Sequence, residues 1–188
     1  QAGVEWPSDR FNDAGDETVS DNFTGLVWTK NAGTPVVGEC NAGDMTWQVA
    51  LDYIQCLNLN TYLGHSDWRL PNKKELDSLV DFSQSGPSLP TVNPFINLRP
   101  FGGYFYLSSD SQGSDKRFVW YKSYDEGSGG SNWKDNRYGL KFYVWPVRGG
   151  ITQIPPPTSG YSSVMFLPGL EGSRLYRKDS NGEDQLWE

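Results

Sequence analysis

The stretch from His65 to Leu76 constrains the fold more than any other part of the chain. Within it, a β-prone run at Asp67–Leu70 ends at a proline, and a helix starts directly afterwards. Asn72, with Glu75 three positions later, has the form of a capping box, in which each side chain bonds to the backbone N–H of the other residue. The pattern predicts a short strand, a sharp stop, and a helix that runs to about Phe82.

The flanking segments predict a second helix and several strands. After Thr46, a suitable N-cap residue, apolar residues recur at the spacing of one helical face as far as Leu57. A turn is expected to separate two short strands between Phe11 and Val19. Further β-prone segments are Asn22–Thr29, Gly103–Ser109, Arg117–Tyr124 and Gly139–Arg148. The Gly- and Ser-rich segment 125–136 is not expected to form a strand. We therefore predict an α+β domain in which two helices pack on twisted antiparallel strands.

The composition limits the classes of ligand. The 188 residues carry a formal net charge of −7, with a pI of about 4.7. Neither the phosphate backbone of a nucleic acid nor an anionic membrane surface attracts such a chain as a whole. The bases are concentrated between Lys116 and Arg148, where they outnumber the acids. No apolar run has the length needed to insert in a membrane. Because the chain begins at Gln1 without a signal peptide, we expect a mature or excised fragment.

The two cysteines, Cys40 and Cys56, lie sixteen positions apart. A disulfide between them would stabilise the fold by roughly 3 kcal/mol if it acts through loop-closure entropy. Two buried free thiols are the alternative. Cys40 lies in a polar, Gly-rich loop, so we favour the disulfide, which is typical of exported proteins.

Candidate reactive and metal-binding groups are few. His65 is the only histidine, and a catalytic triad would also need a nucleophile and an orienting acid, so we expect a structural role for it and no catalysis by these residues. Near the N-terminus, Asp13, Asp16 and Asp21 are candidate oxygen ligands for Ca²⁺. The alternative is that this acidic cluster is the solvated tip of a hairpin, since its spacing does not match an EF-hand loop.

The segment 125–138 combines aromatic, basic and Gly-rich residues, a composition typical of recognition loops. Rigid aromatic side chains there would stack on sugar rings, and the neighbouring basic residues would suit an anionic glycan or an acidic partner. Strand alternation implies that about half of the nearby aromatic residues belong to the core. The predicted ligand-binding residues are Trp120, Tyr121, Tyr124, Trp133, Lys134, Asp135, Asn136 and Arg137.

Several short motifs occur in a fixed order along residues 9–150: Arg10-Phe11, Thr24-Gly25-Leu26 with Trp28, Thr46-Trp47, Ser66-Asp67-Trp68-Arg69-Leu70-Pro71, Lys74-Glu75-Leu76 and Val147-Arg148-Gly149. Together they resemble a bacterial family of domains of unknown function, named for the C-terminal domain of the collagen-like adhesin Lcl. The resemblance implies a C-type-lectin-like fold, related to the formylglycine-generating enzyme group and to the variable proteins of diversity-generating retroelements. It also implies export from the cell, and the adhesin member is associated with binding of sulfated glycosaminoglycans.

The sequence departs from two groups of relatives. The Glu-Pro-Asn or Gln-Pro-Asp tripeptide of calcium-dependent sugar-binding lectins is absent, and Trp133-Lys134-Asp135 is only similar to their Trp-Asn-Asp motif. The oxidase relatives need a reactive cysteine pair late in the fold, whereas Cys40 and Cys56 lie in the first half. Neither calcium-dependent sugar coordination nor oxidase activity is therefore expected.

The remaining segments are predicted to lie outside this domain. Residues 1–8 form an N-terminal extension, and residues 151–160 form a linker with polyproline character. The stretch Val164–Leu175 resembles the start of secreted α/β-hydrolase lipases of the lecithin:cholesterol acyltransferase type, so we expect residues 161–188 to begin such a domain. No Gly-x-Ser-x-Gly nucleophile motif is present.

These observations predict a non-catalytic recognition module, secreted, periplasmic or on the surface of a bacterium. It would bind a glycan or a protein through the segment 125–138. One alternative is an accessory domain of a secreted lipase or esterase whose catalytic part lies beyond residue 188. The other is a structural or assembly domain.

Overall fold

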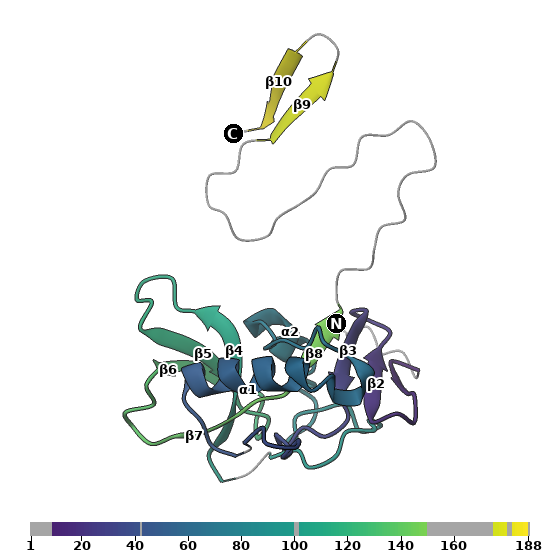
Figure 1. Ribbon diagram of the computed structural model, residues 1–188, viewed down its shortest axis with the longest axis vertical. Helices are drawn as coiled ribbons and strands as arrows, with labels where there is room; N and C mark the ends of the chain where they lie inside the picture. The colour runs from purple at the N-terminus through teal and green to yellow at the C-terminus, as the bar shows by residue number, and fades with distance from the viewer. Residues whose placement is uncertain (1–8, 42, 100–101, 150–174, 180–181, 188) are drawn as a thin grey trace. The chain divides into compact units, whose positions relative to one another are not determined.

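The computed structural model describes residues 9–41, 43–99, 102–149, 175–179 and 182–187 (Figure 1). The chain divides into two compact units, Gln1–Thr152 and Gln153–Glu188. In the second unit, β9 (Leu175–Asp179) and β10 (Gly182–Trp187) form an antiparallel hairpin. The predicted N-terminal extension 1–8, the linker 151–160 and the first part of the predicted hydrolase-like segment, 161–174, lie outside the described residues.

The described part of the first unit contains two four-stranded sheets, which confirms the α+β class (Figure 1). The first sheet has the order β1-β2-β3-β8, with β1 (Phe11–Asp13), β2 (Thr18–Asp21), β3 (Leu26–Thr29) and β8 (Val147–Gly149). The second has the order β6-β5-β4-β7, with β4 (Tyr104–Ser111), β5 (Phe118–Lys122), β6 (Gly129–Trp133) and β7 (Lys141–Tyr143). All neighbours pair antiparallel except β4 and β7, which are parallel.

The first helix, α1 (Trp47–Leu59), begins where the sequence predicts. The Thr46 side chain accepts a hydrogen bond from the Val49 N–H and so satisfies one of the free donors of the first turn. The face predicted to be apolar is buried: Ala50, Tyr53, Ile54 and Leu57. A disulfide joins Cys56 on this helix to Cys40 in the preceding loop, which confirms the predicted bridge.

The second helix, α2 (Lys73–Ser78), has the predicted capping box. The Asn72 side chain accepts from the Glu75 N–H at 2.8 Å, and the Glu75 carboxylate accepts from the Asn72 N–H at 2.7 Å. The helix ends at Ser78 and does not extend to Phe82, so its predicted length was wrong. The N–H groups of Leu79 and Val80 bond three residues back. This tightens the chain and buries both side chains in the core.

Side chains replace backbone partners where continuous strands were predicted. At Asp67–Leu70 only Arg69 forms a bridge, with Val147. The Asn58 amide binds both backbone groups of Trp68, each at 2.8 Å, and so takes the place of a neighbouring strand. The same substitution divides the predicted strand 139–148 into β7 and β8. There the Thr34 hydroxyl donates to the carbonyl and accepts from the N–H of Val144.

Another predicted strand, Asn22–Thr29, begins only at Leu26. The carbonyl of Asp21 accepts from Thr24 at 3.2 Å and from Gly25 at 2.8 Å, so the chain turns sharply here. Gly25 takes a positive φ of 69°, which side chains disfavour. The hairpin of β1 and β2 is as predicted.

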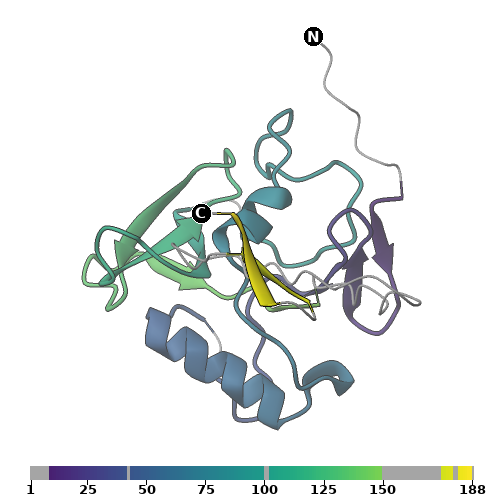
Figure 2. The same cartoon turned by 90° about the horizontal axis from the view of Figure 1, so that it is seen from above.

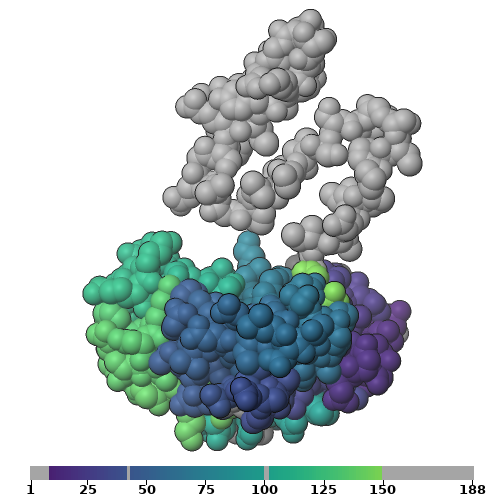
Figure 3. Space-filling model, in the orientation of Figure 1, coloured from purple at the N-terminus to yellow at the C-terminus, as the bar shows by residue number. Residues whose placement is uncertain are grey.

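Two hydrophobic clusters fill the first unit, one on each face of the second sheet. The α1 cluster packs the helix against Leu107, Val119 and Phe142. The opposite cluster joins α2 and β3 through residues that include Tyr106 and Trp145. Viewed from above, α1 lies along the outside and α2 lies between the sheets (Figure 2). The β5–β6 hairpin forms one end of this unit and the β1–β2 hairpin the other (Figure 3). No helix in the described ranges has the length and apolar character of a membrane span.

Candidate functional site

The segment 125–136 contains β6 (Gly129–Trp133), so the prediction that it forms no strand was wrong. β6 pairs along its full length with β5. A Cβ atom on Gly130 would lie 2.7 Å from the Tyr121 hydroxyl, and one on Gly129 would lie 2.9 Å from the Tyr121 carbonyl oxygen. The glycines therefore allow Tyr121 to pack closely on the strand, and they do not indicate a loop.

The hairpin divides its side chains between two faces because successive residues of a strand point to opposite sides. Val119 and Tyr121 pack against the α1 cluster. Phe118 and Trp120 point to the other side, and the register places Trp133 opposite Phe118 with ring centroids 4.4 Å apart. We call Phe118, Trp120 and Trp133 the aromatic face. All three side chains are partly exposed.

Two arginines lie over the Trp133 ring, with Arg137 Cζ 3.7 Å and Arg117 Cζ 4.7 Å from its centroid. We call this group the arginine–tryptophan stack. Each guanidinium is held by a carboxylate two residues earlier: Arg117 by Asp115 and Arg137 by Asp135, both at 2.6 Å. The hydrogen bonds from the Arg117 guanidinium lower the pKa of Asp115 to about 2. The stack therefore holds its arginines oriented and locally neutralised.

The aromatic face continues to α2 through a shared carboxylate. Lys73 Nζ lies 5.5 Å from the centroid of Trp120 and 3.0 Å from Asp77, and Lys122 Nζ lies 2.8 Å from the same carboxylate. Burial acts to raise the pKa of Asp77, but the hydrogen bonds from Lys122 and Lys73 outweigh it and hold this pKa below the ordinary value. This network fixes Trp120 relative to the helix.

Several residues predicted to bind ligand lie elsewhere. Tyr124 is fully buried and its hydroxyl donates to the Leu76 carbonyl, which places it in the core and corrects its assignment to the binding surface. Burial raises its pKa well above the usual value. Tyr121 packs between Phe105 and Phe142. Tyr121 lies on the side of β5 that α1 covers, and Tyr124, which follows β5, lies in the opposite cluster beside α2.

Two further predicted residues support the turn after β6. Asn136 adopts a positive φ of 52°, and its amide bonds to both backbone groups of Leu140, which identifies a turn-forming residue. Lys134 Nζ lies 3.9 Å from the centroid of Trp47, at the start of α1. Of the predicted set, Trp120, Trp133, Asp135 and Arg137 are brought together on one surface.

The predicted ligand-binding residues did not include three that belong to this surface: Arg117, Phe118 and Lys73. A signal for Arg117 does exist, because Asp115-Lys116-Arg117 and Asp135-Asn136-Arg137 repeat the pattern Asp-x-Arg. In both copies the carboxylate accepts from the arginine side chain and from its backbone N–H. Tyr138, which directly follows the second copy, is 70% exposed.

The three candidate calcium ligands are not brought together. Asp21 is buried in an ion pair with Arg10, at 2.8 Å. Asp13 pairs with Lys30 at 2.8 Å, and Asp16 accepts from the backbone and hydroxyl of Thr18. Within the described ranges, no group of three or more His, Cys, Asp or Glu side chains is arranged to hold a metal ion.

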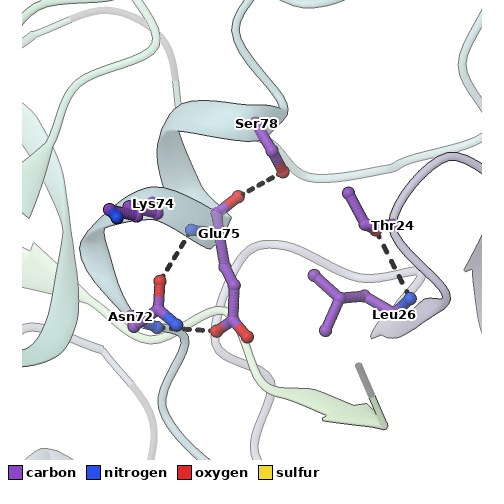
Figure 4. A pocket seen from close by; sticks show the side chains of 6 residues that line it. All are labelled: Thr24, Leu26, Asn72, Lys74, Glu75 and Ser78. Atoms are coloured by element: carbon purple, nitrogen blue, oxygen red, sulfur yellow. Dashed lines mark hydrogen bonds between the residues drawn. The ribbon is translucent and has the colours of Figure 1, made fainter. Parts of the chain in front are cut away.

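The concave sites found among the described residues are small. One, of about 190 Å³, lies beside the capping box and is lined by Thr24, Leu26, Asn72, Lys74, Glu75 and Ser78 (Figure 4). Another, of about 180 Å³, lies beside the disulfide. Small-molecule sites usually exceed roughly 300 Å³. In the first, Glu75 already binds Arg69 with both oxygens, at 2.7 Å each. The residues that line these two pockets therefore serve mainly to hold the fold together. The exposed aromatic face is the stronger candidate for a ligand-binding site.

Comparison with known proteins gives one match. The family model described as the Lcl C-terminal domain matches residues 17–148. This range includes α1, α2, the second sheet with the aromatic face, and the first sheet apart from β1 and the last residue of β8. No curated protein and no solved structure matched significantly.

Proposed function

Because this chain belongs to the Lcl C-terminal domain family, with residues 17–148 matched, we propose that it is a non-catalytic recognition module. Its proposed ligand is a glycan that stacks on the aromatic face beside the arginine–tryptophan stack. The proposed fold is C-type-lectin-like, and the proposed location is outside the cytoplasm of a bacterium. A Cys40–Cys56 disulfide is compatible with such an oxidising location.

The observation that carries the proposal is the arginine–tryptophan stack itself. Trp133 is held by Phe118 on the neighbouring strand and by two arginines that are themselves held by carboxylates. A preorganised aromatic side chain loses little conformational entropy when a ligand stacks on it. The paired Arg and Asp groups offer donors and acceptors side by side, which suits the hydroxyl groups of a sugar. Because each arginine is neutralised, this surface favours an uncharged ring.

The surroundings of His65 support a structural role for this residue. Its ring packs edge-to-face on Trp68 at 5.9 Å, and it directly follows the 3₁₀ turn Tyr62–Gly64. The buried tyrosines Tyr53, Tyr106 and Tyr124 have pKa values raised by burial, so they hold their protons more firmly than usual. None of these groups combines a nucleophile with an adjacent base.

A printed glycan array, followed by calorimetry on the strongest binder, tests this function. We expect Trp133→Ala to weaken binding by about tenfold or more, since stacking at a central aromatic residue is typically a hot spot. Phe23→Ala is the matched control, because Phe23 is a 63% exposed aromatic residue in the turn between β2 and β3. Circular dichroism confirms that both variants fold.

Two results would contradict the glycan assignment. One is an array on which the unmodified chain binds nothing. The other is a loss of affinity that is the same in Phe23→Ala and Trp133→Ala. Binding of a protein by the aromatic face, with no glycan bound, would keep the surface but replace the ligand class.

A further inference from the structure

A second group of cations and aromatic rings lies at the other edge of the second sheet, where β7 pairs with β4 (Figure 1). Tyr104 and Tyr143 contact each other edge-to-face, with centroids 5.4 Å apart. Lys141 Nζ lies 5.3 Å and Arg99 Cζ 5.8 Å from the Tyr104 centroid, and Arg99 Cζ is 5.7 Å from that of Tyr143. We call these four residues the tyrosine–cation cluster. Both cations are exposed.

The two clusters differ in charge balance. In the arginine–tryptophan stack each arginine has its own aspartate. Within the described ranges, no ion pair involves Arg99 or Lys141. Asp44, which bonds to β7, accepts from the Phe142 N–H at 2.7 Å. The tyrosine–cation cluster therefore retains two positive charges on a chain that is otherwise acidic.

We propose that the tyrosine–cation cluster binds carboxylates of an acidic polypeptide segment. This site lies apart from the glycan surface and does not depend on it. The rings orient the two cations by cation–π contact and leave their N–H donors for an anion. Hydrogen bonds to a carboxylate would replace water at both cations and would be charge-assisted.

An extended peptide fits the arrangement of the two cations. Alternate side chains of an extended chain lie on one side, roughly 7 Å apart. The two cations lie 5.3 and 5.8 Å from the centroid of the same ring, that of Tyr104. Because exposed arginine and lysine side chains are long and flexible, two carboxylates at alternate positions of a peptide can each meet one cation.

Two-dimensional NMR of the full chain with a Glu-rich dodecapeptide tests the proposal. The probe is compared with the isosteric Gln-rich peptide at a low ionic strength of about 0.01 M, where the Debye length is about 30 Å. We expect saturable shifts at Arg99, Tyr104, Lys141 and Tyr143 with the Glu peptide alone. The resonances of Arg117, Trp133 and Arg137 should stay unchanged.

Charge-matched variants separate local binding from the net charge of the chain. Arg99→Gln with Lys141→Gln should weaken binding of the Glu peptide by at least about tenfold, because two charge-assisted contacts are lost. Lys74→Gln with Lys116→Gln removes the same charge from exposed sites and should change the affinity by less than about twofold. An equal loss in both double variants would overturn the proposal, as would equal binding of the Gln peptide or shifts centred on Trp133.

An oligogalacturonate is the third probe in this NMR experiment, after the Glu-rich and Gln-rich peptides, because it carries carboxylates on sugar rings. Binding of this glycan at the tyrosine–cation cluster without binding of the Glu peptide would refute the polypeptide assignment. A result at this cluster leaves the glycan array and the Trp133→Ala test unaffected, so the two proposals fail separately.

Discussion

At the scale of single residues, the candidate site depends on two short Asp-x-Arg units. In each unit the aspartate fixes the arginine, and both arginines then lie over Trp133. The units lie on different sides of β5 and β6 in the sequence, and they meet only because Phe118 pairs with Trp133. Each aspartate–arginine contact joins residues only two positions apart in the sequence. The contact of both arginines with Trp133, in contrast, depends on the pairing of two strands.

The Asp115–Arg117 pair makes a prediction about titration. Arg117→Gln is expected to raise the pKa of Asp115 from about 2 toward its ordinary value of 3.8, since the hydrogen bonds from the guanidinium are the main cause of the shift. Carboxyl carbon shifts measured by NMR against pH give the midpoint directly. Lys116→Gln removes the same charge one residue away and should leave the midpoint in place. An unmoved midpoint in Arg117→Gln would show that another group sets this pKa.

The sign of the accompanying stability effect follows from the direction of the shift. A carboxyl group with a lower pKa in the folded chain favours folding above its unfolded pKa and loses this contribution as the pH falls through the folded value. For Asp115 this window lies between 3.8 and about 2. Because the carboxylate is open to solvent, screening keeps the effect small, and the NMR midpoint is the better readout.

At the scale of elements, β6 shows how glycine can be required inside a strand. Gly129 and Gly130 leave room for Tyr121, which packs between Phe105 and Phe142 on the α1 side. The strand therefore forms because the aromatic residue of its neighbour fills the space that its own side chains lack. The same close packing turns Trp133, at the end of the strand, toward the opposite face.

This packing predicts different costs for two adjacent alanine substitutions. Gly129→Ala should lower the free energy of unfolding by about 1–3 kcal/mol, because its Cβ would meet the fixed Tyr121 carbonyl oxygen at 2.9 Å. Gly130→Ala should cost less, since the Tyr121 hydroxyl that it meets can move aside. Urea denaturation measures both. Gly113→Ala is the control, because nothing lies within 4 Å of its Cβ; a cost there equal to that of Gly129→Ala would argue against this explanation.

At the scale of the whole matched domain, Trp145 joins the two sheets. It lies in the segment between β7 and β8 and is fully buried. Its ring contacts Trp28 of the first sheet at 5.3 Å and Tyr106 of the second at 5.6 Å, and its indole N–H donates to the Thr29 carbonyl at 2.9 Å. One side chain thus links β3 to β4 through both packing and a hydrogen bond.

Trp145→Ala is expected to lower the free energy of unfolding by about 3–5 kcal/mol, because it leaves a large cavity between the sheets. The measurement is guanidinium denaturation followed by far-UV circular dichroism. Trp120→Ala, on the partly exposed aromatic face, should cost about 1 kcal/mol. Similar losses for both variants would show that Trp145 does not carry the contact between the sheets.

Much of this architecture could be predicted from the sequence because its signals are local. The capping box at Asn72 and Glu75, the buried face of α1 and the first hairpin each depend on residues within a few positions of one another. The ordered motifs also identified the family over the region that its model matches. The strand ends were predicted less well, since the side chains of Asn58 and Thr34 replace backbone partners from distant parts of the chain.

The sequence by itself determined that aromatic and basic residues would gather near the segment 125–138, but only the tertiary structure decided which of them face outward. Alternation fixes that Trp120 and Tyr121 point to opposite sides, and it does not say which side is covered. The position of α1 covers Tyr121, and Tyr124 is enclosed against α2. The register of β5 with β6 then joins Arg117 to Trp133, a contact that no local pattern encodes because strand pairing is set by the packing of the entire domain.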